Sequence, residues 1–154
     1  MRWRDFAEAS PELAAFGEGL FREFTLVYLA TVRADGAPRV HPVTIAFSGG
    51  DLYVFIVGGT PKCADLMRDG RYALHSFPRF RGGAVSGYVD HEFGCSGHAI
   101  PVDDPAVRDG VVAVHNDTVH EGDVLFRLEL ERAFCKRRDA DGRAVYTRWR
   151  AGRS

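Results

Sequence analysis

The stretch Leu52–Leu66 reads LYVFIVGGTPKCADL and contains two different patterns. Leu52–Val57 is an almost wholly apolar run of β-branched and aromatic residues, which is typical of a buried strand. Gly58 to Lys62 then changes to turn residues, and Thr60 as N-cap with Pro61 at the first position predicts a short helix that Arg68-Asp69-Gly70 ends. We therefore expect a buried strand that leads directly into a short helix.

This junction has the chemistry of an anion site. The free amides and the dipole at the start of a helix attract negative charge. Gly58 and Gly59 permit close approach of a ligand to the backbone, Thr60 can donate its hydroxyl, and Lys62 adds a positive charge. The P-loop pattern GxxxxGK[ST] is absent. A site of phosphate size is predicted, and the alternative is a surface helix whose glycines only make the turn.

Hairpin patterns precede this stretch. Leu26–Arg33 alternates as a strand does, Ala34-Asp35-Gly36 is a hairpin turn signal, and Arg39–Phe47 is again β-branched and aromatic. With Leu52–Val57 these segments predict an antiparallel meander. Within the second strand, an inward Arg39 would be costly unless it met an anion; the alternative is an arginine that is solvated on the open face.

The remaining segments predict more strands and short helices. Ser10 as N-cap and Pro11 at the first helical position predict an N-terminal helix over about residues 10–24. Further strands are expected at Arg71–Phe77, His91–Val102, Val124–Arg132 and Ala144–Arg150, and a further helix from Asp104 to about His115. Six or seven strands in hairpins with short helices favour a closed or split barrel in an α+β protein.

Length, charge and the cysteine pattern exclude several classes of protein. The 154 residues predict a single domain over 1–154, and the formal net charge of -1 argues against a general nucleic-acid binder. The chain has no apolar run long enough to span a bilayer and no signal-peptide pattern at its start, so we expect a cytoplasmic protein without membrane contact. Cys63, Cys95 and Cys135 form no CxxC pair, so we expect buried thiols.

Three segments together resemble a known family. They are YLATVRADGAPRVHPV (Tyr28–Val43), LYVFIVGGTPKCADLMRDGRYAL (Leu52–Leu74) and FGCSGHAIPVDDPAVRDGV (Phe93–Val111). In this order they resemble the flavin-binding split-barrel family that includes pyridoxamine 5'-phosphate oxidases, over about Phe24–Val112. The resemblance implies a six-stranded antiparallel split β-barrel with short flanking helices. It also implies a homodimer with FMN in a groove between the subunits, and a flavin-dependent oxidoreductase that acts on a small molecule.

The resemblance also implies which residues bind the cofactor, and it identifies no catalytic residue. The implied set is Arg39 at the phosphate, Val40, His41, Pro42, Val43 and Thr44 along the flavin ring, Phe55 and Ile56 beside the ribityl chain and ring, and Thr60 and Lys62 at the phosphate-binding turn. Glu92 falls near a position where the family often has a glutamine that meets the flavin. A carboxylate is a different group, so Glu92 is left out of the set.

Departures from the family pattern leave the substrate open. A true pyridoxamine phosphate oxidase has a lysine at the position of Thr44 and an Arg-Lys pair where this chain has Pro61-Lys62. Its C-terminal Arg-Leu-x-Pro is replaced here by Trp149–Gly152. We therefore do not expect oxidation of vitamin B6.

Three other functions stay open. A deazaflavin-dependent reductase on the same barrel would share the lysine-bearing turn. A non-enzymatic flavin or haem carrier would have His41, His75 or His98 as its axial ligand in the haem case. A structural dimer would use Phe21, Phe24 and Tyr28 only as interface packing.

Other chemistry-bearing segments predict no further site. His91, Cys95 and His98 lie close in sequence, but strand alternation places His98 on the opposite face unless a bulge at Gly94 or Gly97 resets the register, so no metal site is expected. His115 and His120 flank a loop and are expected to be solvated. The arginine-rich segment Pro78–Gly83 is expected to form a loop near the mouth of the cofactor groove.

Overall fold

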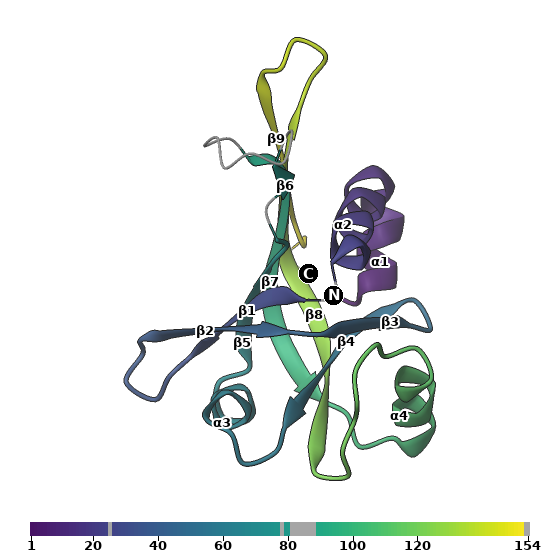
Figure 1. Ribbon diagram of the computed structural model, residues 1–154, viewed down its shortest axis with the longest axis vertical. Helices are drawn as coiled ribbons and strands as arrows, with labels where there is room; N and C mark the ends of the chain where they lie inside the picture. The colour runs from purple at the N-terminus through teal and green to yellow at the C-terminus, as the bar shows by residue number, and fades with distance from the viewer. Residues whose placement is uncertain (25, 78, 81–88, 153–154) are drawn as a thin grey trace.

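The computed structural model describes residues 1–24, 26–77, 79–80 and 89–152, so most of the segment Pro78–Gly83 lies outside the described residues. An antiparallel sheet curls around the core, and four short helices flank it (Figure 1). The strands are β1 Val27–Val32, β2 Pro38–Val43, β3 Ile45–Ser48, β4 Asp51–Val57, β5 Arg71–His75, β6 Arg79–Phe80, β7 Val89–Pro101, β8 Asp123–Arg138 and β9 Ala144–Arg150. The helices are α1 Trp3–Ala9, α2 Pro11–Glu23, α3 Pro61–Arg68 and α4 Pro105–Val112.

A single residue of the chain connects the two ends of the curled sheet. Its strand order is β2-β1-β5-β7-β8-β4-β3, with β6 paired to β7 and β9 paired to β8. β2 and β3 thus lie at opposite ends of the path, yet only Thr44 separates them in the chain. The two ends of the sheet are therefore adjacent, and the strand predicted over Arg39–Phe47 is two strands that pair with β1 and β4.

The α+β split barrel is confirmed, but the strand count differs from six. Seven strands follow one another along the sheet path. The difference comes from Thr44, because one predicted strand supplies both β2 and β3. β8 also runs beyond the predicted Val124–Arg132, because its second half pairs with β9 to form a hairpin that projects from the barrel (Figure 1).

Two helices cover one side of the barrel. α2 occupies the predicted N-terminal helix, whereas α1 was not predicted. Trp3 and Phe6 of α1 are buried, and the ring of Trp3 lies 5.0 Å from that of Phe47. Arg4 binds Asp51 of β4 through Nε at 3.2 Å and Nη2 at 2.6 Å, which fixes α1 to the sheet.

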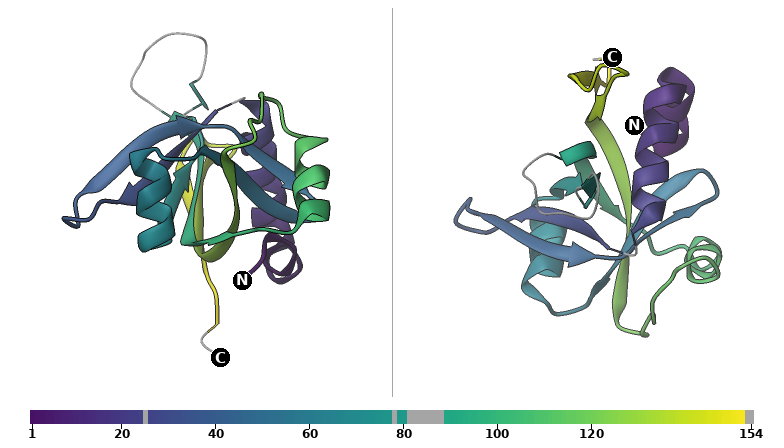
Figure 2. Two further views of the ribbon diagram at one scale, coloured as in Figure 1. Left: turned by 90° about the horizontal axis from the view of Figure 1, so that it is seen from below. Right: turned by 45° about the horizontal axis from the view of Figure 1, so that its top comes forward.

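The other two helices lie on either side of the barrel, as the left view of Figure 2 shows. Asp104 caps α4 as predicted, because its carboxylate accepts from the amides of Ala106 at 2.9 Å and Val107 at 3.3 Å. α4 ends at Val112, earlier than the predicted His115. Among the described residues, no helix is both long and apolar enough to cross a bilayer.

Candidate functional site

Arg39 lies on the inward face of β2 and meets a carboxylate of the protein itself. It stands opposite Thr31 in the β1–β2 register, and Thr31 is buried. The Nε atom of Arg39 donates to Oδ2 of Asp65 in α3 at 2.8 Å, and the hydroxyl of Thr31 donates to the same oxygen at 3.0 Å. Arg68 lies 3.4 Å from the other carboxylate oxygen. The anion expected beside an inward Arg39 is therefore present, as Asp65.

This arrangement leaves part of the guanidinium free. Burial by itself would raise the pKa of Asp65, but the hydrogen bonds from Arg39 and Thr31 outweigh it and hold the pKa below its ordinary value. The ionised carboxylate thus fixes Arg39 through Nε. Within the described residues, the two terminal nitrogens of Arg39 make no hydrogen bond. A guanidinium has five N–H donors, so those of the terminal nitrogens are available for a ligand.

The predicted phosphate-binding turn forms, but its residues act differently than expected. A Cβ atom on Gly58 would lie 2.3 Å from the carbonyl oxygen of Gly122, and Gly59 has φ of +74°. Packing and backbone conformation therefore require both glycines, whether or not a ligand approaches. The hydroxyl of Thr60 donates to the carbonyl of Val57 at 2.7 Å and does not cap α3.

The first turn of α3 consequently has free donors. Its N-cap side chain makes no hydrogen bond to the helix, and within the described chain no other side chain accepts from the amides of Lys62 and Cys63. Lys62 is half-buried in this turn and precedes Asp65 by three positions. Residues three apart lie on neighbouring parts of a helix surface. The Arg39–Asp65 ion pair therefore brings the arginine of β2 to the same helix as Lys62.

The side chains of Val40–Thr44 lie on both the outer and the inward face of the sheet. Val40 and Pro42 are exposed on the outside of β2, whereas His41 shares the inward face with Val43, which is 5% exposed. Thr44 is 8% exposed at the break between β2 and β3. A ring on either face would therefore contact alternate side chains of this stretch.

The side chains of Phe55 and Ile56 on β4 pack against other parts of the protein. Ile56 is 1% exposed in the core. The ring of Phe55 lies 5.3 Å from that of His115 and 4.9 Å from the guanidinium of Arg108 on α4. Any cofactor contact of Ile56 would therefore involve its backbone, and the contacts implied for both residues stay predictions.

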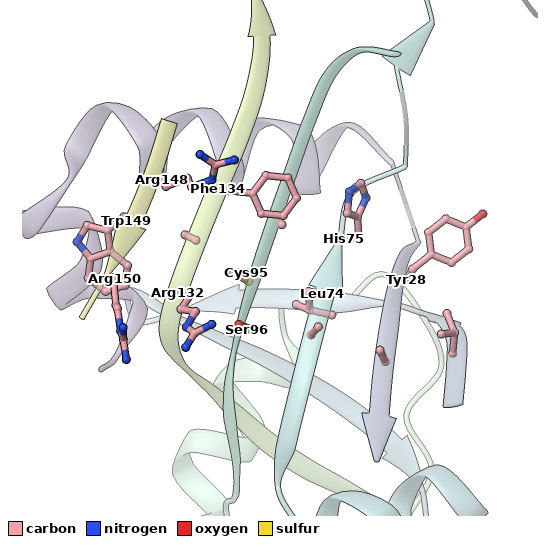
Figure 3. Close-up of a pocket in the computed structure, with 15 residues that line it drawn as sticks. Tyr28, Leu74, His75, Cys95, Ser96, Arg132, Phe134, Arg148, Trp149 and Arg150 are labelled. Atoms are coloured by element: carbon pink, nitrogen blue, oxygen red, sulfur yellow. The ribbon is translucent and has the colours of Figure 1, made fainter. Parts of the chain in front are cut away.

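A groove of about 720 Å³ lies on the outer face of the sheet, over β1, β5, β7, β8 and β9. Figure 3 shows Tyr28 and His75 on one side of it, Phe134 between, and Arg132, Arg148 and Arg150 on the other side. A Cβ atom on Gly94 would lie 2.3 Å from the ring of Phe134. The glycine therefore lets this ring lie against the sheet. The exposed Val40 borders the same groove.

One of the three candidate haem ligands lines this groove. Nδ1 of His75 lies 2.7 Å from the carbonyl oxygen of Ser76, and its Nε2 lies 3.6 Å from a carboxylate oxygen of Glu92. His41 is half-buried on β2, and His98 is exposed and binds Glu131 at 2.9 Å. Among the described residues, no group of three or more His, Cys, Asp or Glu side chains is placed to hold a metal ion.

Sequence comparison identifies the family. A family profile described as Pyridoxamine 5'-phosphate oxidase matches residues 13–135, which include the Arg39–Asp65 pair, the turn before α3 and most of the groove. The chain belongs to the pyridoxamine 5'-phosphate oxidase family. No curated protein sequence matches this family member.

Solved structures share the fold of this family member at low sequence identity. A heme binding protein from Mycobacterium smegmatis superimposes with a TM-score of 0.63 at 19% identity, over 86% of this chain and 57% of that one. The present chain thus spans little more than half of that protein. HutZ, a heme storage protein from Vibrio cholerae, gives 0.58 at 17% identity, over 85% and 92% of the two chains. A proposed 5-nitroimidazole antibiotic resistance protein from Bacteroides thetaiotaomicron gives 0.62 at 11% identity, over 77% and 80%.

The sequence did not point to several residues of this family member's site. Asp65 was not singled out, although a carboxylate on the helix that carries Lys62 is a visible signal for an arginine partner. Arg148 and Arg150 alternate with Trp149, which shows that they share a face of the last strand. The positions of Arg150 opposite Arg132 and of Arg148 opposite Phe134 depend on the β8–β9 register, which the alternation of one strand does not determine.

Proposed function

We propose that this protein binds FMN as a homodimer and uses it for redox chemistry on a small molecule. The observation that carries the proposal is the arrangement of Arg39. Asp65 holds it by Nε and leaves its terminal nitrogens free, beside the helix that carries Lys62. The family to which the chain belongs supports the assignment.

The donors at this position suit the phosphate of FMN. A phosphate dianion is bound by guanidinium and ammonium groups and by the free amides of a helix start. Arg39 and Lys62 provide the two charges, and the uncapped first turn of α3 provides the amides. Asp65 offsets part of this charge, while Arg68 adds to it.

Each part of the site has a distinct task in this proposal. Bound FMN would transfer electrons between a donor and the substrate, and the chain would bind and orient it. Arg39 and Lys62 would hold the phosphate, and Val40 to Thr44 would border the ring. A second copy of the chain would cover the open side of the cofactor and exclude water.

Flavin content after purification with added FMN tests the proposal. We expect the visible absorption of bound flavin in the wild type. Arg39→Ala and Lys62→Ala should each weaken FMN binding about ten-fold or more, because each removes a charged hydrogen-bond donor. Arg33→Ala is the control, since the Arg33 side chain is exposed and pairs with the exposed Asp35 at 3.5 Å.

Two results would contradict this assignment. One is a wild-type protein that takes up no flavin, with a Lys62→Ala variant whose absorption spectrum is the same as that of the wild type. The other is displacement of bound FMN by much lower concentrations of the deazaflavin cofactor, which would make the protein a deazaflavin-dependent enzyme on the same barrel. Analytical ultracentrifugation tests the homodimer separately.

Haem binding is a second candidate, favoured by the geometry of His75. A histidine that donates Nδ1–H to a carbonyl has Nε2 free to bind a metal, and metal-ligating histidines have this arrangement. Nδ1 of His75 lies 2.7 Å from the Ser76 carbonyl, and the side chain lines the groove. A carboxylate oxygen of Glu92 lies 3.6 Å from Nε2 and would have to give way to the metal. Two structural relatives are described as heme binding and heme storage proteins. Haem titration should then give a Soret band that His75→Ala abolishes and His98→Ala leaves unchanged.

A further inference from the structure

Two arginines of the groove stand directly opposite each other. In the β8–β9 register Arg132 pairs with Arg150, and Phe134 pairs with Arg148. Side chains paired in this way lie on the same face of the sheet and interact, and like charges directly opposite each other destabilise a sheet. The hairpin therefore places three guanidinium groups along one side of the groove (Figure 3) at a cost in stability.

Among the described residues, no carboxylate neutralises these three charges. Most of the described arginines bind a carboxylate, as Arg4 binds Asp51. Within the described part of the chain, the side chains of Arg132, Arg148 and Arg150 have no ion pair and no hydrogen bond, and the guanidinium of Arg148 lies 5.8 Å from the ring of Tyr146. An anion from outside the chain would relieve the repulsion between them.

The rest of the groove supplies an aromatic surface and a hydroxyl. Ser96 stands opposite Arg132 in the β7–β8 register and lines the groove beside it. The ring of Phe134 lies over Gly94, with Ala73 and Tyr28 toward the other side. A volume of about 720 Å³ lies in the range of small-molecule sites. The groove thus joins a cationic side to an apolar, aromatic side.

We propose that this groove binds a small aromatic molecule that carries a phosphate or carboxylate group. The anionic group contacts Arg132 and Arg150, and the aromatic ring packs against Phe134. The site is distinct from the Arg39–Lys62 position proposed for the cofactor phosphate. Binding in the groove does not depend on flavin; only the further step, that the bound molecule is the substrate, rests on the proposed function.

Fluorescence titration with 2-naphthyl phosphate tests the site, with 2-naphthol as the uncharged molecule of the same ring. The full chain should bind the phosphate at least ten-fold more tightly than the alcohol, since charged hydrogen bonds contribute this much. The double variant Arg132→Gln/Arg150→Gln should remove this preference. Arg137→Gln is the matched control, because Arg137 is an exposed arginine of β8 on the opposite face, and its side chain has no partner among the residues that the structure describes.

Equal affinity for the two molecules, or an unchanged affinity in the double variant, would overturn the proposal. A double variant that binds 2-naphthyl phosphate normally but no longer self-associates on size-exclusion chromatography would also overturn it, and would assign the arginines to a contact between copies. Flavin content of the same variants separates the two proposals. Arginine-dependent binding by a wild type that takes up no FMN supports the groove site and contradicts the cofactor assignment.

Discussion

The Nε atom of Arg39 and a carboxylate oxygen of Asp65 lie 2.8 Å apart, although 26 positions separate the two residues in the chain. Their ion pair joins β2 to α3, and the side chain of Asp65 is only 4% exposed. A buried charge that loses its partner keeps its desolvation penalty. The pair therefore stabilises the attachment of α3 and at the same time holds the guanidinium of Arg39, whose side chain is 26% exposed.

Asp65→Asn should lower the free energy of unfolding by about 1–3 kcal/mol, because it removes a charged acceptor of several hydrogen bonds in a buried position. Urea denaturation at neutral pH measures the change. Asp69→Asn is the control: Asp69 binds Arg71 at 2.6 Å, but Arg71 is 60% exposed. Solvent screens such a pair, so the control should lose much less stability. Equal losses would show that the burial of Asp65 is not decisive.

The effect of Asp65→Asn should depend on pH. The folded-state pKa of Asp65 lies below its ordinary value of 3.8, so its carboxylate stabilises the fold above the pKa of the unfolded chain. This contribution is lost as the pH falls through the folded-state pKa. The stability difference between wild type and variant should therefore be full near neutral pH and shrink on the acid side, in urea titrations repeated down to about pH 3. A difference that is constant over this range would contradict the assignment.

The same substitution should affect the cofactor if FMN binds at Arg39. Without the carboxylate, the arginine loses the contact that orients it, and we expect FMN affinity to fall about ten-fold. Quenching of flavin fluorescence measures the affinity. Arg39→Lys keeps the charge but lacks the planar fork, so it should also bind FMN more weakly. A folded Asp65→Asn protein with unchanged FMN affinity would show that Asp65 has only a structural role.

The sequence predicted the elements of the fold well because their signals are local. The proline and aspartate at the start of α4 and the alternation in β1 act within a few residues. The break at Thr44 is different, because the stretch from Arg39 to Phe47 contains Pro42 but no turn signal at Thr44 itself. β2 pairs with β1 and β3 pairs with β4, and these pairings depend on how the whole sheet curls.

The candidate site was less predictable for the same reason. Arg39 and Lys62 were found from local motifs, whereas Asp65 contacts Arg39 only after α3 packs against β1 and β4. The glycines before α3 were interpreted as room for a ligand. Gly58 in fact makes room for the carbonyl of Gly122, a residue far along the chain. Contacts of this kind are set by tertiary packing, and no local pattern contains them.

Two glycines in α2 should respond in opposite directions to alanine. A Cβ atom on Gly17 would lie 2.5 Å from the ring of Phe93, which is fully buried, whereas no atom lies within 4 Å of a Cβ on Gly19. Gly17→Ala should therefore destabilise the protein by about 1–3 kcal/mol through overpacking. Gly19→Ala should stabilise it by about 0.4–1 kcal/mol, since alanine has less freedom in the unfolded chain. Thermal denaturation of both variants measures these changes, and a common sign would refute the packing of α2 on β7.

Alkaline pH should destabilise the fold through Cys95. Burial raises the pKa of the Cys95 thiol from 9.0 to about 12, and burial also raises the pKa of Tyr72 well above its ordinary value. The folded state therefore favours the protonated thiol. Its contribution to stability is complete below the pKa of the unfolded chain and is lost as the pH rises toward about 12.

Urea titrations at rising pH should thus show a loss of stability that begins near the ordinary pKa of a thiol, and Cys95→Ala should reduce it. Tyr72→Phe should further reduce this loss of stability at high pH, because burial also keeps the phenol of Tyr72 protonated in the folded state. In the native protein at mildly alkaline pH, Cys95 should resist a thiol-specific reagent, since the thiolate is the reacting species. Rapid modification of Cys95 without unfolding would show that the thiol is accessible and that burial does not raise its pKa.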